Sequence, residues 1–320
     1  MTNVERLNSK RTIIRTVVSL IEAHGLVKTF GKVKALNGFD LSVKKNTVHA
    51  LVGPNGSGKS TAVKILAGEL KPDEGSAIID GLPVASKEAQ RMVSQVPDIC
   101  RVPDNLTPSV LLWKHGKALR LAKEEIGYRI DVLTGMLGLG PSMDVKIGEL
   151  SRGMKRRVSI GMALIADASV ILMDGSLAEL DPIFCAELIN HLRSTEDKTI
   201  LLTSNNMDML DRICDGVTII KDGATLLNES MTSVREKIGR PAVTLRVSPL
   251  NQTRLVQSLN QLLFVNQIYA GEGLVTVEVD EIMHIPGVIR HASSLTEIYE
   301  ARQTMTSLED LYRSFFEPAQ

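Results

Sequence analysis

Short apolar runs that end at Gly, Asn, Asp or Pro recur along the chain from residue 21 onward. Runs of this kind, bounded by turn residues, predict β-strands. They fall within residues 21–30, 43–58, 77–81, 169–174, 199–204 and 216–223. Between them lie segments of helical period such as residues 59–70, where Val63, Ile65, Leu66 and Leu70 share one face. Strands that alternate with helices predict an α/β fold built on a mostly parallel sheet.

The same pattern divides the chain into parts. Residues 85–165 are largely helical in pattern, including a long amphipathic stretch at 114–137. Near residue 230 the pattern changes to a strand, a helix, a hairpin around Gly271–Gly273, and a capping box from Thr306 to Glu309 before a last helix. We therefore expect an N-terminal extension over 1–20, a main domain over 21–228 with a helical subdomain at about 85–165, and a small α+β accessory domain over 229–320.

The first 20 residues admit two interpretations. Ile14, Val17, Val18 and Ile21 fall at helical spacing with Arg11 and Arg15 nearby, so the segment could form a short amphipathic helix on an anionic membrane surface. The alternative is a frayed extension that runs into the first strand, which is the more common condition of a terminus. The segment lacks the small-residue cleavage site of a secretory signal.

Composition and charge exclude several classes of protein. Lys+Arg and Asp+Glu both number 37, and this balance argues against a general nucleic-acid binder, which would carry a basic excess. No apolar run approaches the 18 or so residues that a membrane-spanning helix needs. The three cysteines (Cys100, Cys185, Cys214) and the six histidines show no metal-ligand spacing. Three scattered cysteines form no disulfide framework, which fits a reducing cytosol.

Residues 53–60 carry the strongest chemical signal. They read GPNGSGKS and match the phosphate-binding pattern G-x-x-x-x-G-K-[ST] between an apolar strand and a helix. Backbone N–H groups must wrap a polyphosphate closely, and glycine allows that approach. Lys59 can reach the β/γ-phosphates, and the Ser60 hydroxyl can ligate Mg²⁺. The motif predicts that a nucleotide contacts Gly53, Asn55, Gly56, Ser57, Gly58, Lys59, Ser60 and Thr61.

Three further motifs follow the phosphate loop in the sequence. Residues 150–157 read LSRGMKRR, the strand at 169–174 ends in Asp174, and Leu180-Asp181-Pro182 follows that strand. Over residues 21–225 this order resembles the ATP-binding cassette (ABC) ATPases of membrane transporters. The tail, which ends SLEDLYRSFF, is similar to the accessory domain of ABC-2-type exporter subunits.

The resemblance implies a P-loop NTPase cassette that binds ATP and Mg²⁺, with Ser60 and Asp174 on the metal. It implies a second cassette, identical or not, whose ATP would meet the signature residues Ser151, Arg152, Gly153 and Met154 of this chain. Asp181 would lie in the D-loop. Phe30 sits where the family stacks an aromatic on adenine, although a buried strand aromatic is the alternative. A separate transmembrane permease, placement on the inner face of the cell membrane and no nucleic-acid partner are also implied.

Four positions depart from the family pattern. Gly175 stands where the family has the glutamate that activates water, and Asn205 replaces the switch histidine. Asp98 occupies the usual position of the Q-loop glutamine, with Gln95 available only if the loop slips by three residues. Arg152 replaces the first signature glycine and could either contact the partner's γ-phosphate or obstruct closure.

These departures leave two functions open. Loss of a positioned base costs on the order of 10²–10⁴-fold in rate, whereas the phosphate loop still predicts binding. Glu179 is one candidate replacement for the base. We expect an ATP-binding subunit that drives a membrane partner; the alternative is a non-hydrolysing regulatory cassette that supports a competent partner. A ribosome- or DNA-acting cassette is disfavoured by the single phosphate loop and the neutral charge.

Overall fold

The computed structural model describes residues 19–98, 102–175, 177, 180–195, 197–238, 241–271, 273–305 and 308–316. Of the first 20 residues, only Ser19 and Leu20 lie in the described part of the chain, so the two interpretations of this segment fall outside it. Glu179 and Thr306 also lie outside the described residues. Within the described residues, no helix is both long and apolar enough to cross a membrane.

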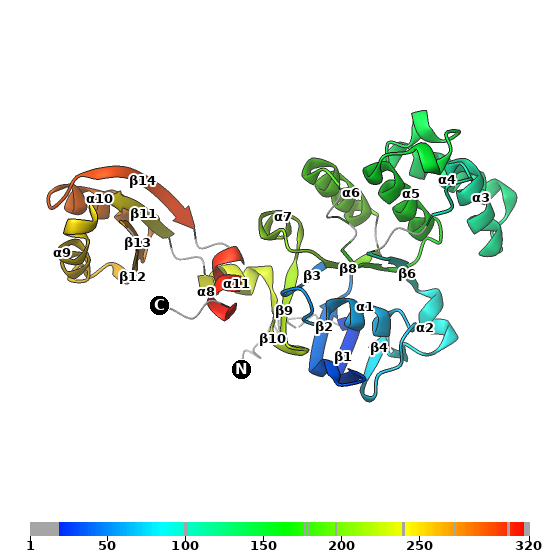
Figure 1. The fold of residues 1–320 in the computed structure, drawn as a ribbon, viewed down its shortest axis with the longest axis horizontal. Coiled ribbons are helices and arrows are strands. Elements are labelled where there is room, and N and C mark those ends of the chain that lie inside the picture. Colours follow the sequence, from blue (N-terminus) through cyan, green and yellow to red (C-terminus); the bar gives the residue numbers. More distant parts are fainter. Residues whose placement is uncertain are drawn as a thin grey trace, which may run out of the picture.

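A six-stranded sheet with the order β10-β9-β3-β8-β7-β6 forms the centre of the main domain (Figure 1). Its parallel strands are β3 (Val48–Val52), β6 (Val93–Val96), β7 (Val170–Met173), β8 (Thr199–Thr203) and β9 (Gly216–Lys221), and β10 (Ala224–Ser230) pairs antiparallel to β9. Strands β3, β7 and β8 are buried along their whole length, as strands covered on both faces are. The predicted parallel sheet is confirmed.

A second, antiparallel sheet was not anticipated from the sequence pattern. Its order is β2-β1-β4-β5, from β1 (Ser19–Phe30), β2 (Val33–Lys44), β4 (Glu74–Ile79) and β5 (Leu82–Pro83). Helix α1 (Lys59–Leu66) buries Ala62, Val63, Ile65 and Leu66 in one core with residues of both sheets. The helix that follows the phosphate loop is thus held between the two sheets.

The helices of the middle segment correct one detail of the prediction. They are α2 (Lys87–Arg91), α3 (Pro108–Ala118), α4 (Lys123–Met136) and α5 (Arg152–Leu164), with short 3₁₀ turns at Gly140–Ser142 and Ile147–Glu149. Strand β6 lies inside the segment 85–165, and the stretch 114–137 is two helices rather than one. The chain turns between them, where Arg120 adopts a left-handed φ of 62°. Helices α6 (Pro182–Ser194) and α7 (Met207–Ile213) complete the main domain.

The accessory part is an antiparallel sheet covered by two helices. The sheet order is β12-β13-β11-β14, from β11 (Pro241–Val247), β12 (Val265–Gly271), β13 (Leu274–Val279) and β14 (Ile298–Met305). Helices α9 (Pro249–Leu259) and α10 (Ile285–Ser293), the latter preceded by a 3₁₀ turn (Ile282–His284), contribute to its separate core. The hairpin is confirmed, because Gly271 pairs with Leu274. Strand β14 was not predicted.

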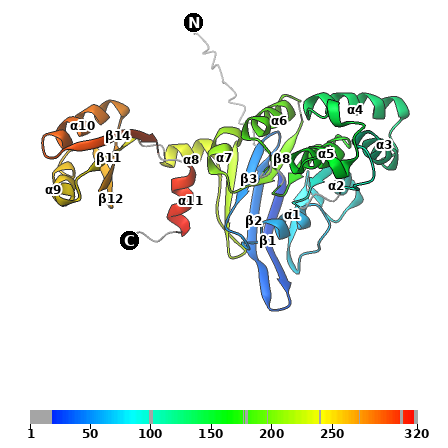
Figure 2. The same ribbon diagram turned by 45° about the horizontal axis from the view of Figure 1, so that its top comes forward.

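The last helix belongs with the main domain and not with the accessory sheet. Helix α11 (Leu308–Phe316) contributes Leu308 to the main core, as α8 (Met231–Ile238) contributes Met231 and Val234. Lys221 of β9 donates to the Phe315 carbonyl at 3.2 Å. The expected boundary at 229–320 is therefore corrected: the accessory core takes its residues from 243 to 298, beyond α8 and α11 (Figure 1, Figure 2).

Candidate functional site

The phosphate loop joins the carboxyl end of β3 to the amino end of α1. Gly58 caps α1 with a φ of 107°, which side chains rarely adopt. A Cβ at Gly58 would lie 2.8 Å from Leu36 Cδ2 and closer still to the Ala35 carbonyl. Glycine is therefore required at this position by both backbone conformation and space. The loop leads into the N-terminus of α1, where helix polarity favours an anion.

The side chains of the loop fit a bound polyphosphate. Lys59 Nζ folds back to donate to the carbonyls of Gly53 at 2.8 Å and Pro54 at 2.9 Å. Burial lowers the pKa of Lys59, and the negative charge of Asp174 opposes that shift. Ser57 Oγ is buried and has no hydrogen-bond partner among the described residues. Neither Gly53 nor Ser57 lines the pocket at this site: the Ser57 hydroxyl is buried beneath the loop, 2.7 Å from where a Cβ on Gly53 would lie.

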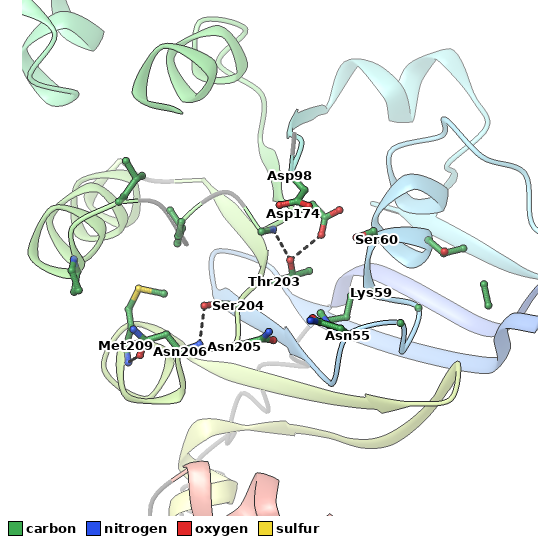
Figure 3. A pocket seen from close by; sticks show the side chains of 18 residues that line it. Asn55, Lys59, Ser60, Asp98, Asp174, Thr203, Ser204, Asn205, Asn206 and Met209 are labelled. Carbon is green, nitrogen blue, oxygen red and sulfur yellow. Dashed lines mark hydrogen bonds between the residues drawn. The ribbon is translucent and has the colours of Figure 1, made fainter. Parts of the chain in front are cut away.

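Asp174 follows β7 and is fixed by a hydrogen-bond chain across two strands. The Thr203 hydroxyl, at the end of β8, donates to Asp174 Oδ1 at 2.9 Å and accepts from the Gly175 N–H at 2.7 Å. Asp174 is 5% exposed. In Figure 3 its carboxylate lies between Thr203 and Ser60. A carboxylate and a hydroxyl are the oxygen ligands that Mg²⁺ prefers, so this pair fits the metal.

These groups surround an open pocket of about 730 Å³. The pocket brings together most of the phosphate loop with Asp174 and three of the four positions that the sequence pattern singled out, Asp98, Gly175 and Asn205. Sequence reasoning missed the other polar residues of its wall, Thr203, Ser204 and Asn206. The available signal was their place after β8, because ligands of open α/β sheets bind outside the carboxyl ends of the strands.

These three positions have distinct surroundings. Gly175 has a left-handed φ of 57°, and a Cβ there would lie 3.0 Å from Asp98 Cγ and closer to its Oδ1. Asp98 lines the pocket and Gln95 does not, because Gln95 lies inside β6, where it pairs with Leu172. The alternative in which the loop slips by three residues and Gln95 takes the Q-loop position is therefore wrong. Asn205 lines the pocket, whereas its neighbour Asn206 caps α7 by accepting from the Met209 N–H at 3.0 Å.

The signature residues begin helix α5 outside this pocket, whereas the D-loop borders it, with Leu180 and Pro182 in its lining and Asp181 between them outside it. Ser151 caps α5 by accepting from the Met154 N–H at 3.2 Å, and Arg152 is exposed. Asp181 caps α6 by accepting from the Ile183 N–H at 2.9 Å. None of these side chains lines the pocket, as expected of groups that would meet a partner's nucleotide.

Phe30 and the basic run after the signature are also placed by the structure. Phe30, at the end of β1, is 50% exposed, so the alternative of a buried strand aromatic is wrong; Lys28 Nζ lies 5.8 Å from its ring centroid. Arg156 is buried and donates to the carbonyls of Pro97, at 2.7 Å, and Asp98. The run 155–157 is thus largely committed to contacts within the chain.

Comparisons with known proteins identify similar proteins. The family model described as ABC transporter matches residues 36–178. The Nod factor export ATP-binding protein I of Burkholderia lata is 32% identical over 210 residues, covering 64% of this chain and 69% of that protein. The daunorubicin resistance ATP-binding protein DrrA2 of Streptomyces coeruleorubidus is 28% identical over 287 residues, covering 88% and 87%. A solved ATP-binding subunit of an ABC transporter superposes with a TM-score of 0.63 at 24% identity, over 68% of this chain and 93% of that one.

The glycine loop, the parallel sheet and the acidic end of β7 define a P-loop nucleotide-binding protein of α/β fold. The family match and the relatives carry this further. The chain belongs to the ABC transporter family and is an ATP-binding subunit of such a transporter. The alternative of a regulatory cassette is not favoured by these relatives. Proteins of this family are ATPases, and its cassettes form dimers that pair with membrane permeases.

Proposed function

We propose that the chain drives export through a separate membrane-spanning partner, from the cytoplasmic face of the membrane. The match to the Nod factor export ATP-binding protein I supports export. The match to the daunorubicin resistance protein spans 287 residues and so extends beyond the main domain into the accessory part. An arabinose import ATP-binding protein from Burkholderia ambifaria is also similar, but only 46% of that protein is covered.

The phosphate loop would hold the triphosphate of ATP. Lys59 would exchange its two loop carbonyls for β/γ-phosphate oxygens, which are better partners for an ammonium because they carry charge. Ser60 and Asp174 would hold Mg²⁺, which neutralises charge on the phosphates when bound. The exposed ring of Phe30 would stack on adenine, with Lys28 adding positive charge beside it.

The signature and D-loop would complete the site of a second cassette. Ser151, Arg152 and Asp181 are exposed and outside the pocket of their own chain, so they are available to a partner. A dimeric cassette structure resembles this chain in fold, with a TM-score of 0.60 over 66% of the chain. We propose that ATP binding closes two cassettes around the nucleotides and that closure moves the permease.

To test this proposal, the full chain is captured from its native membranes in mild detergent, and the proteins that remain bound to it are identified. We expect a membrane-spanning subunit and a cassette, identical or not, to be retained. In the presence of Mg·ATP, Lys59→Ala should weaken retention of the cassette, whereas Lys64→Ala, which removes the same charge from an exposed position of α1, should not. Recovery of the folded chain with no membrane protein would overturn the proposal.

A further inference from the structure

The space next to Gly175 is occupied by the side chain of Asp98. Strands β6 and β7 are parallel neighbours, with Val96 opposite Met173. Asp98 and Gly175 lie two residues beyond that pair on their respective strands, so the register brings them together at the carboxyl edge of the sheet. A Cβ on residue 175 would fall 3.0 Å from Asp98 Cγ. A carboxylate is therefore present beside position 175, but it comes from the adjacent strand.

This carboxylate faces the nucleotide pocket. Asp98 and Asp174 both line the pocket, and Figure 3 shows the two side chains on the same side of it, near Ser60. Among the described residues that line the pocket, these two are the only acidic ones, and none is a histidine. Asp174 is already bonded to Thr203 and fits the metal, which leaves Asp98 for a separate role.

The backbone that carries Asp98 is held from the signature helix. Arg156 of α5 is 3% exposed, and its guanidinium donates to the carbonyls of Pro97 and Asp98. These charge-assisted bonds fix the loop just where the side chain leaves it. Arg156 is five residues after Ser151, the residue that caps α5, so the element that would contact the partner's nucleotide also positions Asp98.

We propose that Asp98 is the general base of ATP hydrolysis in this chain, in place of the carboxylate that position 175 lacks. The inference rests on the proposed function. The water oxygen forms a bond to the γ-phosphorus as the bond from that phosphorus to the bridging oxygen breaks, and ADP leaves with the electron pair. The proton released by the water passes to the Asp98 carboxylate. Asn205 cannot do this, because an amide does not accept a proton near neutral pH.

The test compares Asp98→Asn with wild type in the complex recovered from membranes. Phosphate release is measured as the part that is lost on Lys59→Ala in this chain. Complexes that retain equal amounts of the second cassette are compared, so that release at a partner site is subtracted. Mg·ATP binding to the full chain is measured separately by calorimetry. We expect Asp98→Asn to bind Mg·ATP within about threefold of wild type and to lose about 10²–10⁴-fold in phosphate release. Asp98→Glu should retain more release than Asp98→Asn, and the exposed Asp131→Asn on α4 serves as the matched control.

Three results would overturn the inference. One is phosphate release by Asp98→Asn within threefold of wild type. The second is a higher Mg²⁺ requirement with unchanged release at saturating Mg²⁺, which would make Asp98 a metal ligand. The third is that wild type releases no more phosphate than Lys59→Ala although wild type still binds Mg·ATP. This result would rule out hydrolysis at this chain's own site and leave the proposed nucleotide binding intact. Absence of Mg·ATP binding by wild type would instead remove the proposed function itself, and this inference with it.

Discussion

Replacement of Gly175 by alanine tests the geometry at the centre of the site. The residue has a left-handed φ of 57°, which costs a residue with a Cβ about 1–2 kcal/mol. The new methyl would lie 3.0 Å from Asp98 Cγ, so the Asp98 side chain must turn aside. That movement is cheap because Asp98 is exposed. We therefore expect Gly175→Ala to lower the free energy of unfolding by about 1–2 kcal/mol, nearly all of it from the backbone.

The assay is urea unfolding followed by circular dichroism, with Gly127→Ala as the matched control. Gly127 lies inside α4, and a Cβ added there would have nothing within 4 Å, so alanine at this position should stabilise by about 1 kcal/mol through helix propensity. The same chemical change is thus predicted to have opposite signs at the two sites. A Gly175→Ala variant as stable as wild type would refute the left-handed backbone and, with it, the argument for Asp98 beside position 175.

Three further variants test the surrounding structure. Burial lowers the pKa of His49 from about 6.5 to about 3. Between pH 6.5 and pH 3 the unfolded chain therefore binds a proton at this ring that the folded chain does not, so the folded state loses stability as the pH falls. The stability difference between wild type and His49→Gln should change by about 2 kcal/mol from pH 7 to pH 5 in urea titrations, and an unchanged difference would contradict the burial. Thr203→Val should cost about 1–3 kcal/mol because Asp174 Oδ1 loses its donor, and equal unfolding midpoints would refute that bond. Phe316→Ala should cost about 1–2 kcal/mol through its two ring contacts, whereas Leu263→Ala, fully exposed, should cost almost nothing; equal costs would place α11 elsewhere.

Local patterns predicted the parts of the fold that local chemistry decides. The β3–loop–α1 unit follows from an apolar strand, a glycine-rich turn and a helical stripe within 20 residues. Strand β2 was missed because its first half, from Val33 to Gly38, is mostly exposed and shows little alternation. The break between α3 and α4 within residues 114–137 was missed because Arg120 takes a left-handed backbone conformation, and an arginine side chain does not predict that conformation.

Contacts between distant segments could not be predicted in the same way. The return of α11 to the main domain depends on how the accessory sheet closes between residues 241 and 305, which no local pattern encodes. The meeting of Asp98 with Gly175 depends on β6 and β7 being neighbours, and strand order is not contained in either strand. The sequence therefore predicted that a base was missing at position 175, but not that another carboxylate stands beside it.

The central claim is that the phosphate loop binds Mg·ATP even though the usual base and histidine are replaced. Titration of the full chain with Mg·ATP in a calorimeter tests it most directly. We predict saturable binding by wild type and by Lys64→Ala, and weakening of about 10–100-fold by Lys59→Ala, which loses a charge-assisted bond to phosphate. Equal titrations for Lys59→Ala and wild type, or no binding by a folded wild-type chain, would contradict the account.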